Sequence, residues 1–396
     1  MDRASLNKRL LDALEKMPNV CLHFNHKLTG ADFNKKTAWF EEQRPKKADH
    51  PQNPIQPPYE ESTPERHTEI AVNFDLLVGA DGAHSATRYH MMKYARVNYT
   101  QSYIDTLWCE FRIPPSLTST FAISPHHLHI WPAGSMMFIA IPSLDHSFTC
   151  TLFAPSSHFS TLTSNPSSLL PQFFNTQFPG VTPALIPEQD LISQFTSNPH
   201  LPLISIKCSP YHYSSSVVIL GDAAHAMVPF YGQGMNAGLE DVRVLFEFLD
   251  AHGVYPNTNH STPSPTPSPP QYPSLIPTSH TSSLASALQS YTHHRVPDAH
   301  TINDLALYNY IEMSSGVQSP FYKLRKFIEE SVEVWCPWLG WRTQYARVSF
   351  GNERYSVVRR EVRRQGLLLS AFLGLGIVGV VAGVGVLGLR RWGRLR

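Results

Sequence analysis

The sequence predicts a mixed α/β fold with a separate antiparallel sheet layer and a C-terminal transmembrane helix. Three observations lead to this prediction. Two apolar strands, at residues 74–79 and 217–220, each run into a turn that contains glycine and aspartate. Apolar runs between Leu128 and Phe153 are separated by turn-like segments, as in antiparallel sheets. Residues 366–389 carry no charge, and this apolar run is long enough to cross a bilayer.

The composition excludes several classes of protein. The chain has 396 residues, 42% of them hydrophobic, and a formal net charge of +1, so it can bury a sizeable core and has no charge excess for nucleic acid. Its five cysteines are scattered and form no C-x-x-C pair, which indicates a reducing compartment and no zinc site. The histidine pairs lack further ligands at fixed spacing, so we expect no metal.

The spacing of apolar residues assigns the remaining elements in chain order. Residues 3–17 predict an amphipathic helix that ends at Pro18, and Val20 to Leu28 alternates as a strand does. A helix is expected from about Met235, directly after the second apolar strand. Two segments read as solvated insertions because they are rich in proline and polar residues: 42–66, within a hairpin, and 255–283.

The first candidate site follows the strand at residues 74–79. Asp81 and Gly82 lie at its end, where a carboxylate can accept hydrogen bonds from a ligand's hydroxyls or from the amides of its own loop. Glycine at position 82 permits close approach of a ligand to the backbone. Because Asp-Gly is a common turn, this motif alone leaves both interpretations open.

The second candidate site is the segment 217–241, in which a buried strand enters Gly-Asp and then a glycine-rich turn before a helix. Asp222 is placed to accept a hydrogen bond from a ribityl hydroxyl of a flavin. The amides of Gly234, Met235 and Asn236 would point from a helix N-terminus toward an electron-rich ring edge. Such fixed dipoles stabilise negative charge on a reduced flavin. The alternative is that the glycines serve the turn alone.

Together, LLVGADGAHSATR (76–88) and the segment 217–241 resemble the DG and GD motifs of the class A flavoprotein aromatic hydroxylases. Residues 7–28, 128–132, 147–153 and 309–313 are further similar to the kynurenine 3-monooxygenase family. The resemblance covers most of the chain apart from the two insertions and residues 156–201. It implies an FAD-dependent monooxygenase that uses NADPH and O2 to convert L-kynurenine to 3-hydroxykynurenine, on the route from tryptophan to NAD.

The resemblance also implies roles for individual residues. It places FAD contacts at Arg3, Leu28, Asp81, Gly82, Asp222, Gly234, Met235 and Asn236, and substrate contacts at Phe230, Asn309 and Tyr345. It implies no catalytic acid, base or nucleophile, since the cofactor carries the chemistry. Simpler interpretations stay open: Arg3 as a solvated residue, Asn309 as a buried, satisfied amide, and Tyr345 as an interfacial aromatic.

The fold that the resemblance implies is a partial FAD-binding Rossmann-like domain joined to a sheet domain for the substrate. Its parts are an FAD-binding part at 1–95, the sheet domain at 96–207, a second FAD-binding part at 208–254, the insertion at 255–283, a helical region at 284–360 and the anchor at 366–389. The family opens with a G-x-G-x-x-G turn; here, glycines at comparable spacing occur in the anchor, where a phosphate would not be solvated. Met1 thus aligns inside the family pattern, and we expect weak FAD binding and impaired activity.

Location and partners follow from the same resemblance. It implies the mitochondrial outer membrane, with the catalytic part facing the cytosol, although arginines flank the apolar run on both sides and do not fix its orientation. The expected partners are a small aromatic amino acid and the membrane, with no nucleic acid, and the oligomeric state is left open. Two alternatives remain: a related flavin hydroxylase with another aromatic or lipid substrate, and an inactive, membrane-anchored remnant. A flavin absorbance spectrum would exclude the second.

Overall fold

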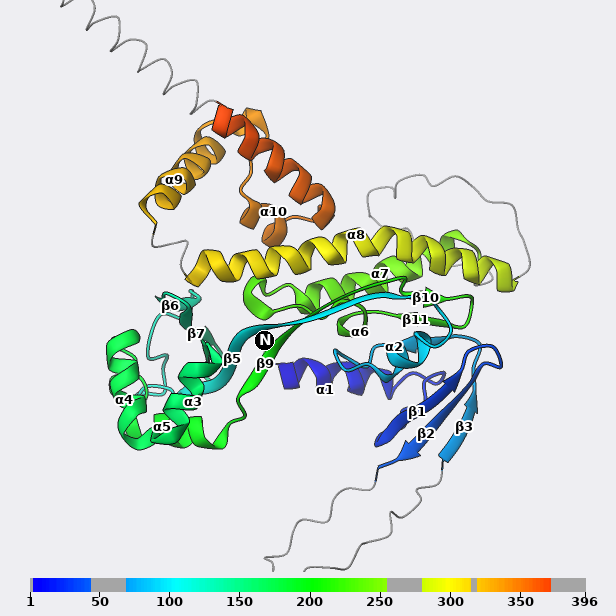
Figure 1. Ribbon diagram of the computed structural model, residues 1–396, viewed down its shortest axis with the longest axis horizontal. Coiled ribbons are helices and arrows are strands. Elements are labelled where there is room, and N and C mark those ends of the chain that lie inside the picture. The colour runs from blue at the N-terminus through cyan, green and yellow to red at the C-terminus, as the bar shows by residue number, and fades with distance from the viewer. Residues whose placement is uncertain (1–2, 44–68, 255–279, 315–318, 372–396) are drawn as a thin grey trace, which may run out of the picture.

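The computed structural model describes residues 3–43, 69–254, 280–314 and 319–371, which form three sheets and the helices around them (Figure 1). The first sheet is antiparallel and contains β1 (His26–Asp32), β2 (Thr37–Glu42) and β3 (Glu69–Asn73). Helix α1 (Arg3–Leu14) precedes it. The predicted strand at Val20 begins only at His26, because Asn25 takes a left-handed conformation with φ of 59°, which interrupts an extended chain.

The second sheet carries the two aspartate turns. Strand β4 (Leu77–Gly79) lies parallel to β11 (Val217–Ile219), and β10 (His212–Tyr213) pairs with the other edge of β11. Helix α2 (Ala86–Met91) follows β4. After β11 come α6 (Asp222–His225), the 3-10 turn η1 (Pro229–Tyr231) and α7 (Gly234–Ala251). The predicted strand at 217–220 and the helix near Met235 are thus confirmed.

The third sheet is antiparallel, as the apolar runs between Leu128 and Phe153 predict. Its strands are β5 (Asn98–Ile113), β6 (His129–Ala133), β7 (Met136–Pro142), β8 (Phe148–Ala154) and β9 (Leu201–Ser209), in the order β6-β7-β8-β5-β9. Helices α3 (Ser156–Ser164), α4 (Pro166–Gln177) and α5 (Glu188–Ser197) cover one face, where a core of phenylalanines such as Phe111, Phe138 and Phe174 is buried. Aromatic burial of this kind supplies much of a core's stability.

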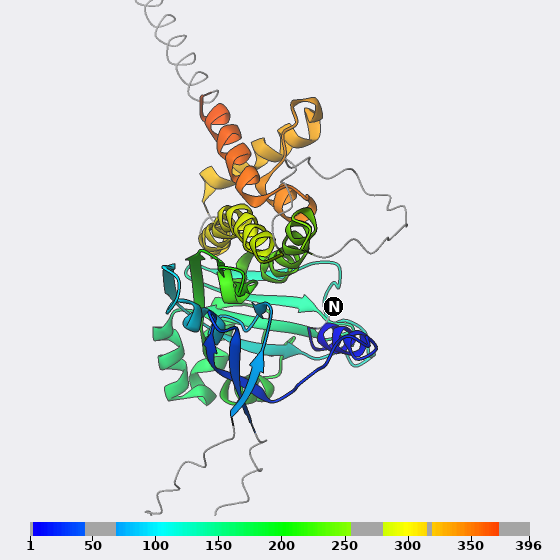
Figure 2. The same cartoon turned by 90° about the vertical axis from the view of Figure 1, so that its right-hand side faces the viewer.

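Two long helices hold these layers together. Helix α8 (His280–Ser314) packs beside α7, and both lie over the second and third sheets (Figures 1 and 2). A shared core joins Phe153 of β8, Phe230 of η1, Ile302 of α8 and Val348 near the C-terminus. This core joins the third sheet to η1, α7 and α8, so it fixes the position of the sheet domain relative to the segment that follows the GD turn.

The C-terminal part forms a separate helical group on the side of α8 away from the sheets (Figure 2). It contains α9 (Pro320–Trp335), the 3-10 turn η3 (Pro337–Leu339), α10 (Gln344–Phe350) and a further helix at residues 355–371. No helix within the described ranges is long and apolar enough to cross a membrane. Residues 372–389 of the predicted anchor, and most of both predicted insertions, lie outside these ranges.

Candidate functional site

Both aspartate turns lie at the same edge of the second sheet. Gly79 of β4 is opposite Ile219 of β11 in the parallel register, and the Leu220 N–H donates to the Gly79 carbonyl at 3.0 Å. Parallel neighbours end on the same side of a sheet, which is where such folds bind ligands. The structure therefore brings the DG and GD turns together, although they are about 140 residues apart in the sequence.

The carboxylate of Asp81 organises its own turn. It accepts hydrogen bonds from the Ser85 hydroxyl at 2.5 Å, the Thr87 amide at 2.9 Å and the Thr87 hydroxyl at 3.0 Å. Ser85 in turn caps α2 by accepting from the Arg88 N–H at 2.9 Å. At Gly82, with φ of +78°, a Cβ would meet nothing within 4 Å, so its backbone is open to a ligand. The FAD contacts at Asp81 and Gly82 stay predictions.

The buried side chain of Arg88 joins the two turns. Its guanidinium donates to the Ala83 carbonyl of the DG turn and to the Ala223 carbonyl of the GD turn, both at 2.6 Å, and it lies 5.1 Å from the centre of the Tyr99 ring. A buried charge is costly unless its hydrogen bonds are satisfied. Arg88 therefore locks the two turns in one relative position.

The GD turn leaves the Asp222 carboxylate free. Gly221 adopts φ of 59° and ψ of −142°, a combination that is essentially restricted to glycine. Asp222 follows with an exposed side chain that makes no hydrogen bond or ion pair within the residues the structure describes. The contrast with Asp81 is clear, because one carboxylate is used by its own loop and the other is available to a ligand.

The start of α7 faces the GD turn and offers unpaired donors. A Cβ at Gly238 would lie 3.6 Å from the Gly221 Cα, so the second turn of α7 is in contact with the GD turn. The N-cap residue Gln233 makes no side-chain capping bond, and the first N–H groups of a helix have no acceptor within it. Within the part of the chain that the structure describes, the amides of Gly234, Met235 and Asn236 are therefore free to bind an electron-rich group.

Beneath the turn lies a buried ionic network that is centred on Asp241 of α7. The carboxylate is fully buried and accepts from the Gly221 amide at 2.8 Å, from His225 Nε2 at 2.6 Å and from Arg295 Nε at 2.7 Å. Burial opposes ionisation of Asp241, but contacts with His225, Arg295 and the Gly221 amide outweigh it and lower the pKa of this carboxyl. Asp241 thus fixes the backbone that presents Asp222.

This donor set fits the flavin cofactor that the sequence predicts. An exposed, unpaired carboxylate can accept from ribityl hydroxyls, and free helix N–H groups can face the electron-rich edge of the ring. Both features lie on one rigid unit, because Asp241 accepts from the Gly221 amide and Arg88 donates to the Ala223 carbonyl. Rigid support is what a cofactor site requires.

On the substrate side, the structure brings Phe230 and Asn309 together. The Asn309 amide donates to the Phe230 carbonyl at 2.8 Å, as the interpretation of a satisfied amide expects. The Phe230 ring stacks on Tyr310 at 4.5 Å and meets Phe153 at 4.9 Å between ring centres. The result is an aromatic wall between η1, α8 and the third sheet.

Tyr345 lies at the edge of this region. Its ring is 56% exposed and meets Phe350 at 5.8 Å. The preceding residue, Gln344, donates to the Tyr231 hydroxyl at 3.4 Å, and burial raises the pKa of Tyr231 to about 12. The start of α10 therefore adjoins η1, while Tyr345 itself makes no hydrogen bond to Phe230 or Asn309 in the described ranges.

Two of the predicted FAD contacts lie apart from the GD turn. Leu28 is in β1 of the first sheet, which reaches the DG region through a hydrogen bond from the Tyr94 hydroxyl to the Ala31 carbonyl at 3.3 Å. Arg3 opens α1. Their cofactor roles stay predictions.

The sequence patterns assigned no role to Arg88, Asp241 or Arg295. Arg88 was visible only as part of the DG segment, and Asp241 only as a polar residue on a helix with an apolar face. Arg295 comes from α8, more than fifty residues further along the chain, and also donates to Glu240 at 2.9 Å. A charged residue within an otherwise apolar helical face is the one local signal that could have found Asp241.

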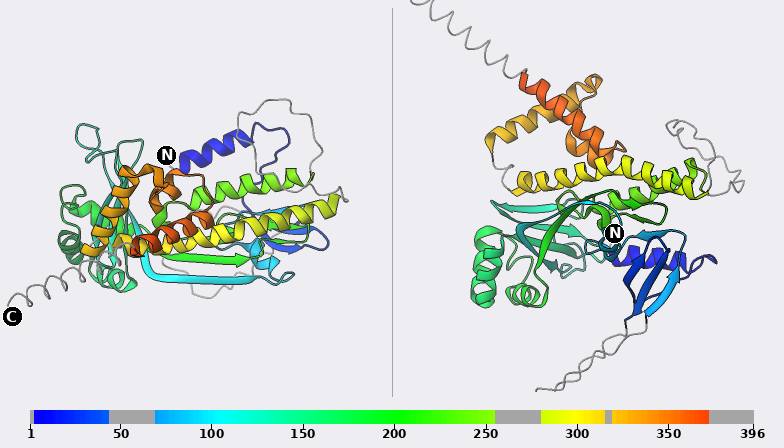
Figure 3. Two further views of the ribbon diagram at one scale, coloured as in Figure 1. Left: turned by 90° about the horizontal axis from the view of Figure 1, so that it is seen from above. Right: turned by 45° about the vertical axis from the view of Figure 1, so that its right-hand side comes forward.

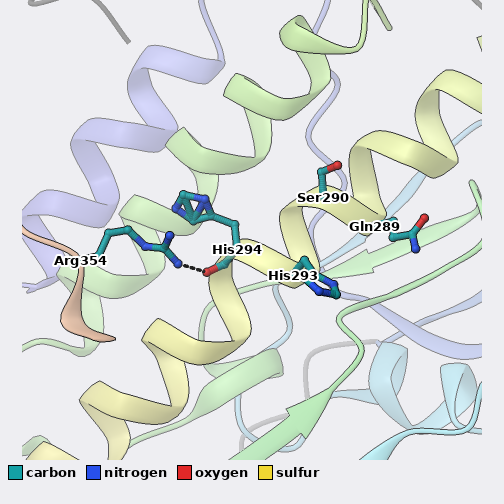
Figure 4. Close-up of a pocket in the computed structure, with 5 residues that line it drawn as sticks. All are labelled: Gln289, Ser290, His293, His294 and Arg354. Atoms are coloured by element: carbon teal, nitrogen blue, oxygen red, sulfur yellow. Dashed lines mark hydrogen bonds between the residues drawn. The ribbon is translucent and has the colours of Figure 1, made fainter. Parts of the chain in front are cut away.

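A pocket of about 450 Å³ is lined by Gln289, Ser290, His293 and His294 of α8 and by Arg354 (Figure 4). Arg354 donates to the His294 carbonyl at 2.7 Å and to Asp298 at 2.8 Å. None of the residues predicted to bind cofactor or substrate lines it. The aspartate turns remain the better candidate for the site.

Solved structures and a family model agree on the class of this fold. The model for the FAD binding domain matches residues 31–253. Two solved structures superpose with 16% sequence identity: 2-methyl-3-hydroxypyridine-5-carboxylic acid oxygenase, at a TM-score of 0.52 over 81% of this chain and 69% of that one, and Klebsiella pneumoniae HpxO complexed with FAD and uric acid, at 0.50 over 82% and 67%. The fold and the site define an FAD-binding flavoprotein of the hydroxylase class.

Curated relatives narrow the class further. A protein of Aspergillus terreus named kynurenine 3-monooxygenase is 58% identical over 396 residues, which is all of this chain and 72% of the relative. One of the same name from Emericella nidulans is 56% identical over 97% of this chain and 71% of the relative. The chain belongs to the kynurenine 3-monooxygenase family of flavin-dependent monooxygenases.

Proposed function

We propose that this protein hydroxylates L-kynurenine to 3-hydroxykynurenine, with FAD as cofactor and NADPH and O2 as co-substrates. The observation that carries the proposal is the identity of 58% along the entire chain to a protein of that name. The arrangement of the GD turn supports it. Asp222 and the first amides of α7 have no partner among the described residues, and buried contacts hold the two segments side by side.

In this proposal, the chain's own residues bind and orient. The Asp222 carboxylate accepts from a ribityl hydroxyl, and the amides of Gly234, Met235 and Asn236 face the ring edge, where fixed dipoles favour negative charge. Arg3, Leu28, Asp81 and Gly82 would complete the cofactor contacts. When bound, FAD supplies the reaction with NADPH and the activation of O2.

The aromatic wall has the complementary task for the substrate. Phe230 would offer a ring face to kynurenine. Asn309 donates to the Phe230 carbonyl, and its amide oxygen, which has no donor among the described residues, would accept from the substrate. Tyr345 borders the same region from α10. Apolar walls that exclude water protect an activated oxygen from wasteful side reactions.

We also propose that residues 366–389 anchor the protein in the mitochondrial outer membrane with the catalytic part toward the cytosol. Support comes from the apolar, uncharged run and from the arginines at 359, 360, 363 and 364 just before it. Resistance of the full chain to alkaline carbonate extraction from isolated mitochondria tests the anchor, and its release into the carbonate supernatant would refute it.

The test of the activity begins with the flavin spectrum of the purified chain. We expect a yellow protein that takes up FAD, consumes NADPH when L-kynurenine is added, and forms 3-hydroxykynurenine detectable by chromatography. The control is Asp250→Ala, a change at an exposed position of α7, the helix that begins at the GD site. This variant should retain both FAD binding and formation of 3-hydroxykynurenine. A colourless chain that refuses added FAD, or one that oxidises NADPH without forming this product, would overturn the proposal.

A further inference from the structure

Helix α9 exposes a row of large apolar side chains. Leu324, Phe327, Val334 and Trp335 recur at helical spacing, and the row continues onto η3 with Trp338. Each is exposed, and the two tryptophans are 75% and 77% exposed. We call these five residues the α9 stripe. Contiguous exposed apolar patches of this kind mark sites of interaction.

The opposite face of α9 is the one that packs against the protein. Tyr322 donates to the Glu312 carboxylate at the end of α8, and Glu333 accepts from the Thr343 amide beside α10 at 3.1 Å. At roughly 100° per residue, Tyr322 and Glu333 point about half a turn away from Leu324 and Trp335. These contacts therefore orient the stripe outward.

The chain beyond the stripe indicates what covers it. The helix at residues 355–371 lies next to α9 and α10 (Figure 3) and leads into the uncharged run at 366–389, and its own Leu367 is 66% exposed. Tryptophan and tyrosine gather at the boundary between headgroups and hydrocarbon. An apolar row with two tryptophans, beside the helix whose residues lead into this uncharged run, fits this boundary.

The surrounding charges favour an anionic surface. Arg359, Arg360, Arg363 and Arg364 precede the apolar run and are joined on α9 by the exposed Lys323. Arg359 pairs with Asp304 at 2.9 Å, but the contacts of Arg360 and Arg364 with Glu361 are long, at 4.0 Å. Basic residues close to a membrane are attracted to anionic headgroups.

We propose that α9 and η3 lie on an anionic lipid bilayer, with the α9 stripe inserted among the headgroups. This proposal rests on the proposed membrane anchor at residues 366–389, which would bring α9 and η3 to the bilayer. Insertion of the stripe would hold the C-terminal helical group at a fixed height above the lipid. Because Gln344 of this group donates to the Tyr231 hydroxyl, the substrate region beside Tyr231 would be held at a fixed height as well.

Quenching of tryptophan fluorescence tests this surface in the full chain. The protein is reconstituted into vesicles of phosphatidylcholine and phosphatidylserine with or without bromine on the acyl chains, in a Trp341→Phe/Trp392→Phe background. We expect brominated lipid to quench this protein strongly, and the quenching to disappear when Trp335→Phe and Trp338→Phe are added. The matched control, Trp108→Phe and Trp131→Phe in the third sheet, should leave the quenching in place.

The outcomes separate the stripe from the anchor. Equal quenching with and without Trp335 and Trp338 would overturn the proposal that the α9 stripe enters the bilayer. This holds even if the chain floats with vesicles after carbonate treatment. If the chain no longer floats with vesicles in carbonate but is quenched at neutral pH, the membrane-spanning anchor is refuted and insertion of the α9 stripe is supported. Cross-linking of two copies through Cys336, which lies between the tryptophans, without quenching would assign the stripe to a dimer and overturn the proposal.

Discussion

The DG and GD turns occupy similar positions after parallel strands, but their aspartate side chains are used differently. Each follows a short parallel strand with glycine and aspartate, yet the Asp81 carboxylate accepts three hydrogen bonds from its own turn, whereas Asp222 accepts none in the described part of the chain. The GD turn is instead held through its backbone, by Asp241. Where the backbone is fixed from elsewhere, the side chain is left for a ligand.

This difference teaches that an aspartate motif does not by itself define a ligand contact. At the DG turn, the short helix α2 follows immediately, and the Thr87 amide in its first turn donates to the Asp81 carboxylate. At the GD turn, a buried carboxylate twenty residues further along replaces that internal support. Single substitutions can disturb each of these supports separately.

The largest effect is expected at Asp241. Asp241→Ala would remove one of the two carboxylates that accept hydrogen bonds from the buried Arg295 and would leave the Gly221 amide without its acceptor, which costs about 3–5 kcal/mol of unfolding free energy. Chemical denaturation of the wild type and the variant measures it. Asp250→Ala, exposed on the same helix, should stay within about 0.5 kcal/mol, and a similarly small loss at Asp241 would contradict the network.

A smaller effect is expected at Gly221. Gly221→Ala places a side chain at φ of 59° and ψ of −142°, so we expect a loss of about 1–3 kcal/mol. Gly238→Ala is the matched change, since its Cβ would make ordinary contact at 3.6 Å and alanine favours a helix by roughly 1 kcal/mol. Thermal unfolding of both variants measures the two effects. An equal shift in the two melting temperatures would refute the claim that the backbone at Gly221 requires glycine.

The pH dependence of stability is expected to report on the same carboxyl. Because the pKa of Asp241 is lowered in the fold, its ionised form contributes stability above about pH 4, the unfolded value. That contribution is lost as the pH falls through the lower folded pKa, with a slope of at most ~1.4 kcal/mol per pH unit. Asp241→Asn should have a shallower acid slope than wild type in denaturation measured at several pH values; identical slopes would exclude an ionised Asp241.

Much of the fold could be predicted from local patterns. The strand at 217–220, the helix near Met235 and the antiparallel run from Leu128 to Phe153 are short-range signals of apolar spacing, and the structure contains all three. The strand expected at Val20 to Leu28 begins too early, since β1 spans His26–Asp32 and alternation does not reveal that Asn25 turns the chain. Apolar spacing reports burial better than it reports where an element begins.

The candidate site could be predicted only at its strand ends. Asp81 and Asp222 follow apolar runs, so their positions were readable, but their different use depends on hydrogen bonds that become visible only in three dimensions. Arg88 reaches across 135 residues to Ala223, and Arg295 across 54 to Asp241. No periodicity encodes such pairings. The exposed row on α9 was missed for the same reason, since packing decides which face is covered.

The measurement closest to the central claim compares the two aspartates directly. FAD binding to the apo-chain is titrated by flavin fluorescence, and unfolding is followed in parallel, for wild type, Asp222→Ala and Asp81→Ala. We expect Asp222→Ala to weaken FAD binding about 10–100-fold, the loss of a hydrogen bond to a charged group, with unchanged stability, while Asp81→Ala lowers stability by about 1–2 kcal/mol. Wild-type affinity for FAD in Asp222→Ala would contradict the account.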